Sequence, residues 1–370
     1  LHMDPCELRL KNMVREDEVM KQYYGEHLNS CALDRCLQKA MEMTGWKEKV
    51  LCRDMGDKVR GLGVALSMQG SGIANVDIAS TVIKLQDDGF YTLSIGATDM
   101  GTGCDTILAQ MAAECLECDV DNIITQSVDT DASPYDTGSY ASATTYVTGM
   151  AVVKTCEELK KQMLREAAIL LEVDEEHITF DGSMLRAVEN AKEISLADFA
   201  NRCFAGGKGE CLIASASHCS PTSPPPFMAG IAEVDVDKLT GEITLVDYAA
   251  VVDCGTIINP NLARIQTEGG IAQGIGMALY EDITYSSKGR MRNNSFLQYK
   301  IPTRQDVGTI RVEFESSFED NGPFGAKSIG EVVINTPAPA IAAGVAHASS
   351  VQIRTLPITA EKVLLKKDED

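Results

Sequence analysis

The sequence has few basic residues, few aromatic residues and no long apolar run, and each shortage excludes a class of function. It holds 33 lysines and arginines against 54 aspartates and glutamates, which gives a formal net charge of −21 over 370 residues. A chain this acidic repels nucleic-acid phosphates and anionic membranes unless a local basic patch opposes the total charge. No such patch stands out in the sequence, so we expect neither a nucleic acid nor a membrane as a partner.

Aromatic side chains make up 5% of the chain, with a single tryptophan at Trp46, so aliphatic residues must build the core. The sequence lacks the run of about 18 apolar residues that a membrane-spanning helix needs, and its first residues lack the basic and apolar regions of a secretory signal. We therefore expect a cytoplasmic protein. In that reducing compartment the twelve cysteines should stay thiols and pack like small apolar residues.

No group of metal ligands stands out either. Cys115-x-x-Cys118 is the one C-x-x-C pair, and it falls in an apolar helical pattern without a second pair at zinc-finger spacing. Packing is therefore the favoured role of this pair. The five histidines never lie within five residues of one another. We expect no metal ion that is bound directly by side chains of this chain.

Length and residue periodicity predict an α+β protein of two mixed α/β subdomains. At about 150 residues per domain, 370 residues suggest two or three core-forming units. The first subdomain is expected at 1–216, with a helical lead-in over 1–60, and the second at 217–370. A proline-dense linker over residues 217–227, with Pro221 and three prolines at 224–226, marks the boundary. Each subdomain contains a hairpin, a glycine-rich loop and a helix in that order, and the first hairpin is expected over 80–95, with strands at 80–85 and 90–95.

Glycine-rich turns follow strands at several points. The strand expected over 90–95 runs into the turn 96–103, and a helix is expected directly after it. Backbone N–H groups and the positive end of the helix dipole at such a junction can hold an anion. The G-x-G-x-x-G pattern and a Walker lysine are absent, so neither NAD nor ATP is favoured. Taken singly each loop is an ordinary turn, but together they suit a large, hydrogen-bonding cofactor with a phosphate.

Two carboxylates lie on or beside these loops, Asp99 and Glu331. On a buried loop either carboxyl could have a raised pKa and act as a base. Alternatively, either could cap a turn or hold a loop by hydrogen bonds. The residues alone leave both roles open.

Seven motifs follow one another along nearly the whole chain. They are D-P-x-E-L-R-x-K-N from Asp4, GATDMGTG from Gly96, DTDASPYDTGSYASATTY from Asp129, EVDVDKLTGEI from Glu233, VVDCGTIINP from Val251, EGGIAQGIG from Glu268 and KSIGE from Lys327. In this order they resemble the molybdopterin-binding subunit of the xanthine dehydrogenase and aldehyde oxidase family. The resemblance is strongest to bacterial xanthine dehydrogenase-like and nicotinate dehydrogenase-like members.

The resemblance implies an incomplete molybdenum subunit. The chain matches only the second of the two large parts of that subunit, so the active site would be completed by the missing first half. The implied cofactor is molybdopterin with molybdenum, in the cytosine dinucleotide or mononucleotide form. The implied partners include an iron–sulfur subunit and an FAD subunit, because no cysteine quartet here fits a [2Fe–2S] cluster.

Carried over residue by residue, the resemblance makes Glu331 the catalytic glutamate, a general base. The residues that match cofactor-binding positions are Gly101, Thr102, Gly103, Ser139, Tyr140, Ala141, Ser142, Gln273 and Gly274. Those that match positions near the substrate are Gln69, Gly70 and Ser71. Thr102 stands where many members have glutamine, which leaves backbone N–H contacts at that turn.

The expected function is hydroxylation of a purine such as xanthine or hypoxanthine, or of a related N-heterocycle, with water as the oxygen source. Two alternatives stay open: an aldehyde oxidoreductase molybdenum subunit, and a non-catalytic subunit for cofactor binding or assembly. A carboxylate at position 331 speaks against a pure scaffold. Because the chain is so acidic, we expect backbone N–H groups of the glycine loops to hold the anionic cofactor.

Overall fold

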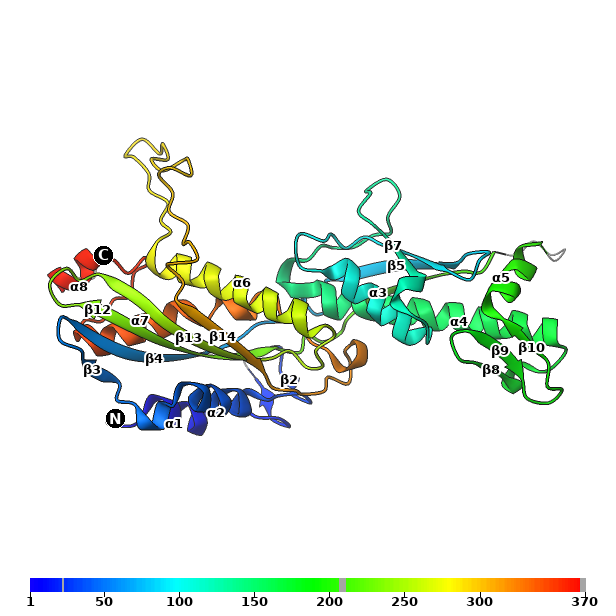
Figure 1. Cartoon of the computed structure of the whole chain (residues 1–370), viewed down its shortest axis with the longest axis horizontal. Coiled ribbons are helices and arrows are strands. Elements are labelled where there is room, and N and C mark those ends of the chain that lie inside the picture. The colour runs from blue at the N-terminus through cyan, green and yellow to red at the C-terminus, as the bar shows by residue number, and fades with distance from the viewer. Residues whose placement is uncertain (22, 206–210, 367–370) are drawn as a thin grey trace. The chain divides into compact units, whose positions relative to one another are not determined.

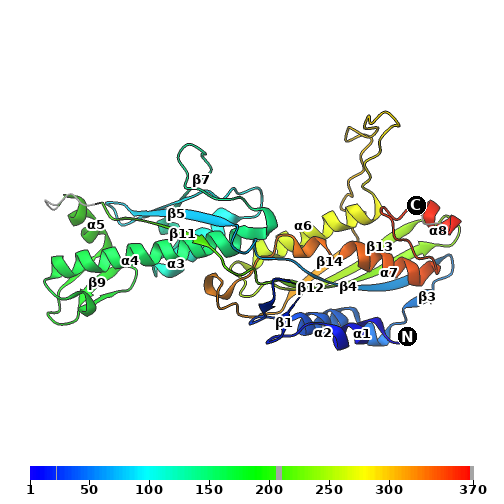
Figure 2. The same ribbon diagram turned by 180° about the vertical axis from the view of Figure 1, so that it is seen from behind.

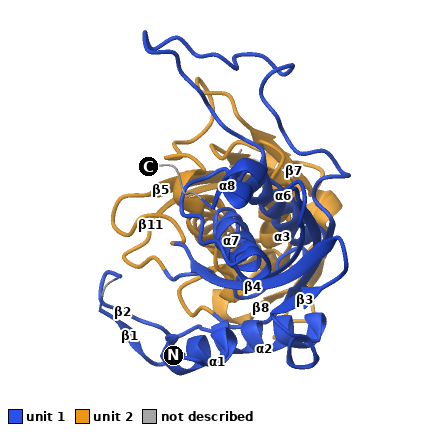
Figure 3. Ribbon diagram, turned by 90° about the vertical axis from the view of Figure 1, so that its left-hand side faces the viewer, with its two compact units in different colours: residues 1–69, 224–318, 329–370 blue, residues 70–223, 319–328 orange. Residues whose placement is uncertain are grey.

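A computed structural model describes residues 1–21, 23–205 and 211–366 of the chain (Figure 1). The chain forms two compact units (Figure 3). Unit 1 comprises residues 1–69, 224–318 and 329–370, and unit 2 comprises residues 70–223 and 319–328. Both units combine helices with β-sheets, which confirms the predicted α+β class.

The two units are not consecutive stretches of sequence, so they differ from the expected division at 216/217. Strand β4 (Lys58–Met68) pairs along its whole length with strand β12 (Phe227–Asp237). This antiparallel pairing places the first 69 residues in the same unit as most of the second half. The proline-dense linker does mark a crossing, because unit 2 gives way to unit 1 after Ser223. Sequence periodicity predicts strands but not which distant strands pair.

Unit 1 is a five-stranded sheet with helices on both faces (Figure 2). The strand order is β14-β13-β12-β4-β3, and only β13 and β14 are parallel. Helices α1 and α2 cover one face, and helices α6 and α7 cover the other. The remaining elements of unit 1 are α1 (Pro5–Asn12), β1 (Val19–Met20), β2 (Glu26–His27), α2 (Leu33–Thr44), β3 (Cys52–Asp54), β13 (Ile243–Asp253), α6 (Pro260–Leu279), β14 (Thr309–Phe314), α7 (Pro337–Ser349) and α8 (Ala360–Leu365).

The residues of β4 alternate between the two helical layers. Leu62 and Val64 pack in the cluster that contains α2. Gly61 and Gly63 face α7, where an added Cβ would lie 2.0 Å from the carbonyl oxygens of Gly344 and Ala340 respectively. Helix α7 therefore packs directly against the backbone of β4, which only glycine permits at these two positions.

Unit 2 contains a four-stranded sheet with the order β11-β5-β6-β7 and a separate three-stranded sheet, β10-β9-β8. The predicted hairpin at 80–95 is confirmed as β5 and β6, and the predicted helix after the turn 96–103 is confirmed as α3. The elements of unit 2 are β5 (Ile78–Leu85), β6 (Tyr91–Ile95), α3 (Cys104–Cys115), β7 (Ile123–Ser127), α4 (Gly149–Leu171), β8 (Ile178–Phe180), β9 (Met184–Ala187), β10 (Glu193–Ser195), α5 (Leu196–Ala205) and β11 (Ile213–Cys219).

The expected helical lead-in over 1–60 is only partly helical. Helices α1 and α2 are present, but the short strands β1 and β2 pair between them, and β3 and the start of β4 also precede residue 60. Met13 and Met20 pack against the buried side chains of Leu28 and Phe227. This contact with β12 is a tertiary effect that the local apolar spacing does not reveal.

All twelve cysteines are free thiols, as predicted. Seven of them, including Cys36 and Cys156, are buried in the cores. Across the described residues, no helix combines the length and the apolar character that crossing a bilayer requires.

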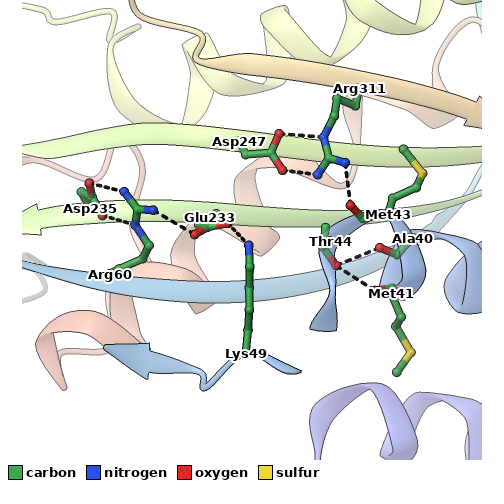
Figure 4. Close-up of polar contacts among 10 residues, drawn as sticks. All are labelled: Ala40, Met41, Met43, Thr44, Lys49, Arg60, Glu233, Asp235, Asp247 and Arg311. Carbon is green, nitrogen blue, oxygen red and sulfur yellow. Dashed lines mark hydrogen bonds and ion pairs between the residues drawn. The ribbon is translucent and has the colours of Figure 1, made fainter. Parts of the chain in front are cut away.

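A polar network lies on the α2 face of the sheet in unit 1 (Figure 4). The guanidinium of Arg60 on β4 donates to both carboxylate oxygens of Asp235 on β12, at 2.7 and 2.8 Å, and to Glu233 at 3.2 Å. Lys49 also donates to Glu233, at 2.5 Å. The Arg60 guanidinium holds the pKa of the Asp235 carboxyl below its ordinary value. The network thus joins β4 to β12 by charged groups as well as by backbone hydrogen bonds.

We predict that Arg60→Met lowers the free energy of unfolding at pH 7 by about 2 kcal/mol, because it removes charge-assisted hydrogen bonds from partly buried carboxylates. The folded pKa of Asp235 is depressed, so this stabilisation is present above the unfolded pKa of about 3.9 and is lost as the pH falls through the folded value. Denaturant unfolding at pH 7 and near pH 3 checks both statements.

The matched control for this prediction is Lys238→Met. Lys238 pairs with Asp54 on an exposed surface of unit 1, so its loss should lower the free energy of unfolding much less than the loss of Arg60 does. Equal destabilisation by the two variants at pH 7 would contradict the stated role of the Arg60–Asp235 pair. So would a difference in the free energy of unfolding between wild type and Arg60→Met that grows as the pH falls.

Candidate functional site

Glu331 and Gln69 meet at the end of β4 in unit 1. Gln69 follows the last residue of β4, and its side-chain Nε2 donates to Oε2 of Glu331 at 3.2 Å. The hydroxyl of Ser67 donates to the carbonyl oxygen of Val332 at 2.9 Å and so ties the residue after Glu331 to the same strand. The structure therefore brings together two predicted site residues that are 262 positions apart.

The carboxylate of Glu331 is exposed in this chain by itself. Its backbone is nevertheless fixed, because Val332 and Val333 directly after it are buried in the core cluster with Ile271 of α6. The amide of Gln69 gives the carboxylate a definite orientation. A carboxylate that is held by its neighbours and open on its outer side can exchange a proton with a molecule bound beside it.

Gln273 and Gly274, which match cofactor-binding positions of the family, lie within helix α6. Gln273 is exposed, but Gly274 is buried. An added Cβ on Gly274 would lie 2.8 Å from the carbonyl oxygen of Ile334 and 2.8 Å from Cγ of Pro337. Close packing of α6 on the start of α7 thus explains Gly274, and it leaves the side chain of Gln273 on the exposed side of the helix.

In unit 2, a framework of serines joins Ser71 to the loop 139–142. The backbone N–H of Gly72, the residue after Ser71, donates to the carbonyl oxygen of Ala141 at 2.8 Å. The hydroxyl of Ser71 accepts from the N–H of Ser328 at 3.0 Å, and the hydroxyl of Ser328 donates to the carbonyl oxygen of Ser142. Ser71 and Ser328 are each only 1% exposed. Ser71 therefore helps to hold the loop 139–142 through buried hydrogen bonds. Gly70 before it is half-buried.

The loop 139–142 has a strained backbone. Ala141 and Ser142 have φ angles of 51° and 58°, in the left-handed region that costs a non-glycine residue about 1–3 kcal/mol. Next to them, the hydroxyl of Tyr140 donates to Oδ1 of Asp77 at 2.6 Å, a bond that raises the pKa of Tyr140 to about 12. Ser139 accepts a hydrogen bond from Thr144 at 2.8 Å. The loop is thus held in one conformation with Tyr140 half exposed.

The turn 101–103 lies between β6 and α3 as predicted, but its N–H groups already have an acceptor. Oδ1 of Asp99 accepts from the N–H of Gly101 at 2.9 Å and from that of Gly103 at 3.1 Å. Burial acts to raise the pKa of Asp99, but these backbone hydrogen bonds hold the pKa below its ordinary value. Asp99 is therefore an ionised cap of the turn and not a base with a raised pKa. The expected backbone cradle for an anionic cofactor holds a carboxylate of the chain itself.

Asp99, Cys104 and Asp105 also bring three ligand atoms within 4.8 Å of one another, a grouping that the sequence did not predict. The Cys104 thiol is buried, and burial raises its pKa to about 12, so it stays protonated at neutral pH. Both carboxylates already accept hydrogen bonds: Asp99 accepts from the turn, and Oδ2 of Asp105 accepts from the hydroxyl of Ser127 at 3.0 Å.

Sequence reasoning missed two residues that position the loop 139–142, Asp77 and Ser328. Ser328 lies inside the KSIGE motif, so the motif itself could have pointed to it. Asp77 carries no local signal, because its contact with Tyr140 spans 63 positions.

Known proteins similar to this chain include members of a cofactor-binding family and curated relatives from Escherichia coli. The model of the molybdopterin cofactor-binding domain family matches residues 37–308. A probable hypoxanthine oxidase of Escherichia coli strain K12, XdhD, is 34% identical over 98% of this chain and 39% of its own length. The putative xanthine dehydrogenase molybdenum-binding subunit XdhA of the same strain is 33% identical over 98% of this chain and 49% of its own length.

Among solved structures, quinoline 2-oxidoreductase from Pseudomonas putida 86 has the same fold, with a TM-score of 0.88 at 23% identity. The match covers 98% of this chain and 49% of that protein chain. This chain thus spans about half, or less, of the length of the proteins that it matches.

We predict that Gly274→Ala lowers the free energy of unfolding by about 1–3 kcal/mol, because the new methyl group has no space against Ile334 and Pro337. Gly269→Ala in the same helix is the matched control. Its Cβ would meet nothing within 4 Å, so the change should stabilise the protein by about 0.5–1 kcal/mol through helix propensity. Thermal unfolding of both variants measures the difference. A Gly274→Ala protein as stable as the wild type would argue against the packing role.

Proposed function

Because this chain belongs to the molybdopterin cofactor-binding domain family, in its xanthine dehydrogenase and aldehyde oxidase branch, we propose that it supplies the catalytic glutamate of a molybdenum hydroxylase. The favoured substrate is a purine such as xanthine or hypoxanthine, or a related N-heterocycle, and water is the oxygen source. The similarity to XdhD, a probable hypoxanthine oxidase, supports a purine.

The observation that carries this proposal is the contact between Gln69 and Glu331. A general base must be fixed within hydrogen-bond reach of the proton that it removes. The anchored turn before η7 (Val332–Ile334) and the amide of Gln69 fix the carboxylate, and its exposure leaves it accessible. On this proposal, Glu331 accepts a proton during the reaction and Gln69 keeps the carboxylate in position.

The proposed cofactor is molybdopterin with molybdenum, in its cytosine dinucleotide form, which when bound supplies the two-electron redox chemistry of the hydroxylation. In unit 2, Tyr140 and Ser142 would offer hydroxyl groups to it, and in unit 1, Gln273 would offer a side-chain amide. Tyr140 commits its proton to Asp77, so its oxygen would serve as an acceptor. These side chains fit a hydrogen-bond-rich cofactor, whereas Gly101 and Gly103 already donate to Asp99 and do not fit a phosphate.

We further propose that the enzyme is an assembly. The polypeptide that supplies the rest of the length of the relatives would complete the molybdenum subunit, since this chain spans 49% of XdhA. An iron–sulfur subunit with [2Fe–2S] clusters and an FAD subunit would carry the electrons away. A cytoplasmic location is part of the same proposal, and twelve free thiols are consistent with a reducing compartment.

We predict that Glu331→Gln in the assembled enzyme lowers the rate of xanthine or hypoxanthine hydroxylation by about 10²- to 10⁴-fold, because the general base is lost. The molybdenum content should stay at the wild-type level, since the change keeps the size of the side chain. Steady-state kinetics and metal analysis of the same preparation measure both quantities.

Glu361→Gln on the exposed start of α8 is the matched control and should leave the rate unchanged. A Glu331→Gln enzyme with the wild-type rate would remove Glu331 from the role of base.

A panel of substrates separates the proposal from its alternatives. The wild-type assembly should oxidise xanthine or hypoxanthine in preference to nicotinate and to an aldehyde. Preference for the aldehyde would favour an aldehyde oxidoreductase. An assembly without molybdenum and without turnover of any of these compounds would favour a scaffold role.

A further inference from the structure

Residues 281–306 form an arm that leaves the end of α6 and extends away from the sheet and helices of unit 1 (Figures 1 and 2). The arm has a defined structure. The N–H of Arg292 donates to the carbonyl oxygen of Thr284 at 2.9 Å in a hairpin. At its base, the hydroxyl of Tyr299 donates to Oε2 of Glu281 at 2.6 Å.

The arm exposes large apolar side chains. Phe296 is 88% exposed and Leu297 is 83% exposed, and Tyr285 and Ile301 are each more than half exposed. Protein surfaces rarely present such a group on one segment unless another molecule covers it. Aromatic side chains together with arginines are typical of protein–protein interfaces.

The arm is also basic, in a chain of net charge −21. Between residues 283 and 304 there is no aspartate or glutamate. The basic residues in this stretch are Lys288, Arg290, Arg292, Lys300 and Arg304, and all are exposed. They are spread over the stretch and not adjacent, so they form no basic cluster in the sequence.

These basic side chains differ from those in the body of unit 1. There, Lys49, Arg60 and Arg311 pair with Glu233, Asp235 and Asp247 (Figure 4). Within the described parts of the chain, no acidic side chain forms an ion pair with any basic residue of the arm. The acidic residues of the arm, Glu281, Asp282 and Asp306, lie at its two ends, so the stretch between them presents positive charge.

We propose that the arm docks this chain onto the polypeptide that supplies the rest of the length of the relatives, at an acidic surface there that also has apolar pockets. This inference rests on the assembly in the proposed function. The chain matches XdhA over 98% of its own length but over only 49% of the length of XdhA. About half of such a subunit would therefore be a separate surface for this chain to contact. Charge complementarity would orient the arm, and Phe296 and Leu297 would be buried.

A second copy of this chain is the weaker candidate for the occupant. Its net charge is acidic too, but a second copy would leave the rest of the length of the relatives without a counterpart. The test below separates the two occupants.

The experiment uses the full chain and, as a separate polypeptide, the sequence from the same organism that aligns with the part of XdhA outside the match. Isothermal titration calorimetry at low salt gives the Kd of the pair. We expect Arg290→Glu/Arg292→Glu and Phe296→Ser/Leu297→Ser each to raise the Kd at least about tenfold. Added NaCl should raise the Kd of the wild type and have less effect on the Arg290→Glu/Arg292→Glu variant.

Two control variants match these changes elsewhere in unit 1. Lys47→Glu/Arg53→Glu reverses two exposed charges, and Leu239→Ser removes a leucine that is 86% exposed. Both should leave the Kd at the wild-type value. The arm variants should unfold at the wild-type temperature, because Phe296 and Leu297 lie outside the core clusters.

An unchanged Kd in both arm variants, or no measurable association of the wild-type polypeptides, would overturn the proposal. Variants that instead abolish self-association of this chain alone would assign the arm to a second copy and overturn the stated partner. Binding is measured without cofactor or turnover, so its outcome is separate from that of the proposed function. A wild-type assembly that lacks molybdenum but depends on the arm would support docking and contradict the hydroxylase.

Discussion

The antiparallel pairing of β4 with β12 is the constraint on which the rest of unit 1 depends. It runs over the eleven residues of each strand and places the start of the chain in a sheet with its second half. Because side chains alternate along β4, the same register presents Gly61 and Gly63 to α7 and Leu62 to α2. A shift by one residue would reverse these faces. Where β4 ends, Gln69 reaches Glu331.

Several glycines of this chain permit close packing between elements. Helix α7 rests on the backbone of β4, and α6 approaches α7 at Gly274. The turn 101–103 has the donors expected of an anion site, but Asp99 accepts from them. An acidic chain thus supplies its own anion there. On our proposal, side-chain hydroxyl and amide groups and a second polypeptide take over the binding of the phosphate-bearing cofactor.

The sequence was sufficient to predict the local elements and the family, and insufficient for contacts between distant segments. Alternation and turn residues predicted β5, β6 and α3, because these signals lie within a few residues. The two compact units differ from the expected division at 216/217 because they depend on the pairing of β4 with β12. The resemblance named Gln69 and Glu331 separately, and only the fold shows that their side chains touch. The structure gives Asp99 and Gly274 other roles than the sequence suggested. A motif shows neither that Asp99 accepts from the turn 101–103 nor that a Cβ on Gly274 would meet Ile334 and Pro337.

The most direct test of the central claim is the molybdenum and pterin content of the wild-type assembly. The assembly is purified from a host that makes the cofactor, and metal analysis is combined with identification of the released pterin nucleotide. A cofactor-binding chain predicts molybdenum and pterin in amounts equal to that of this chain, with cytosine as the base of the nucleotide. An intact assembly that contains neither molybdenum nor pterin would contradict the claim that this chain helps to hold a molybdopterin cofactor.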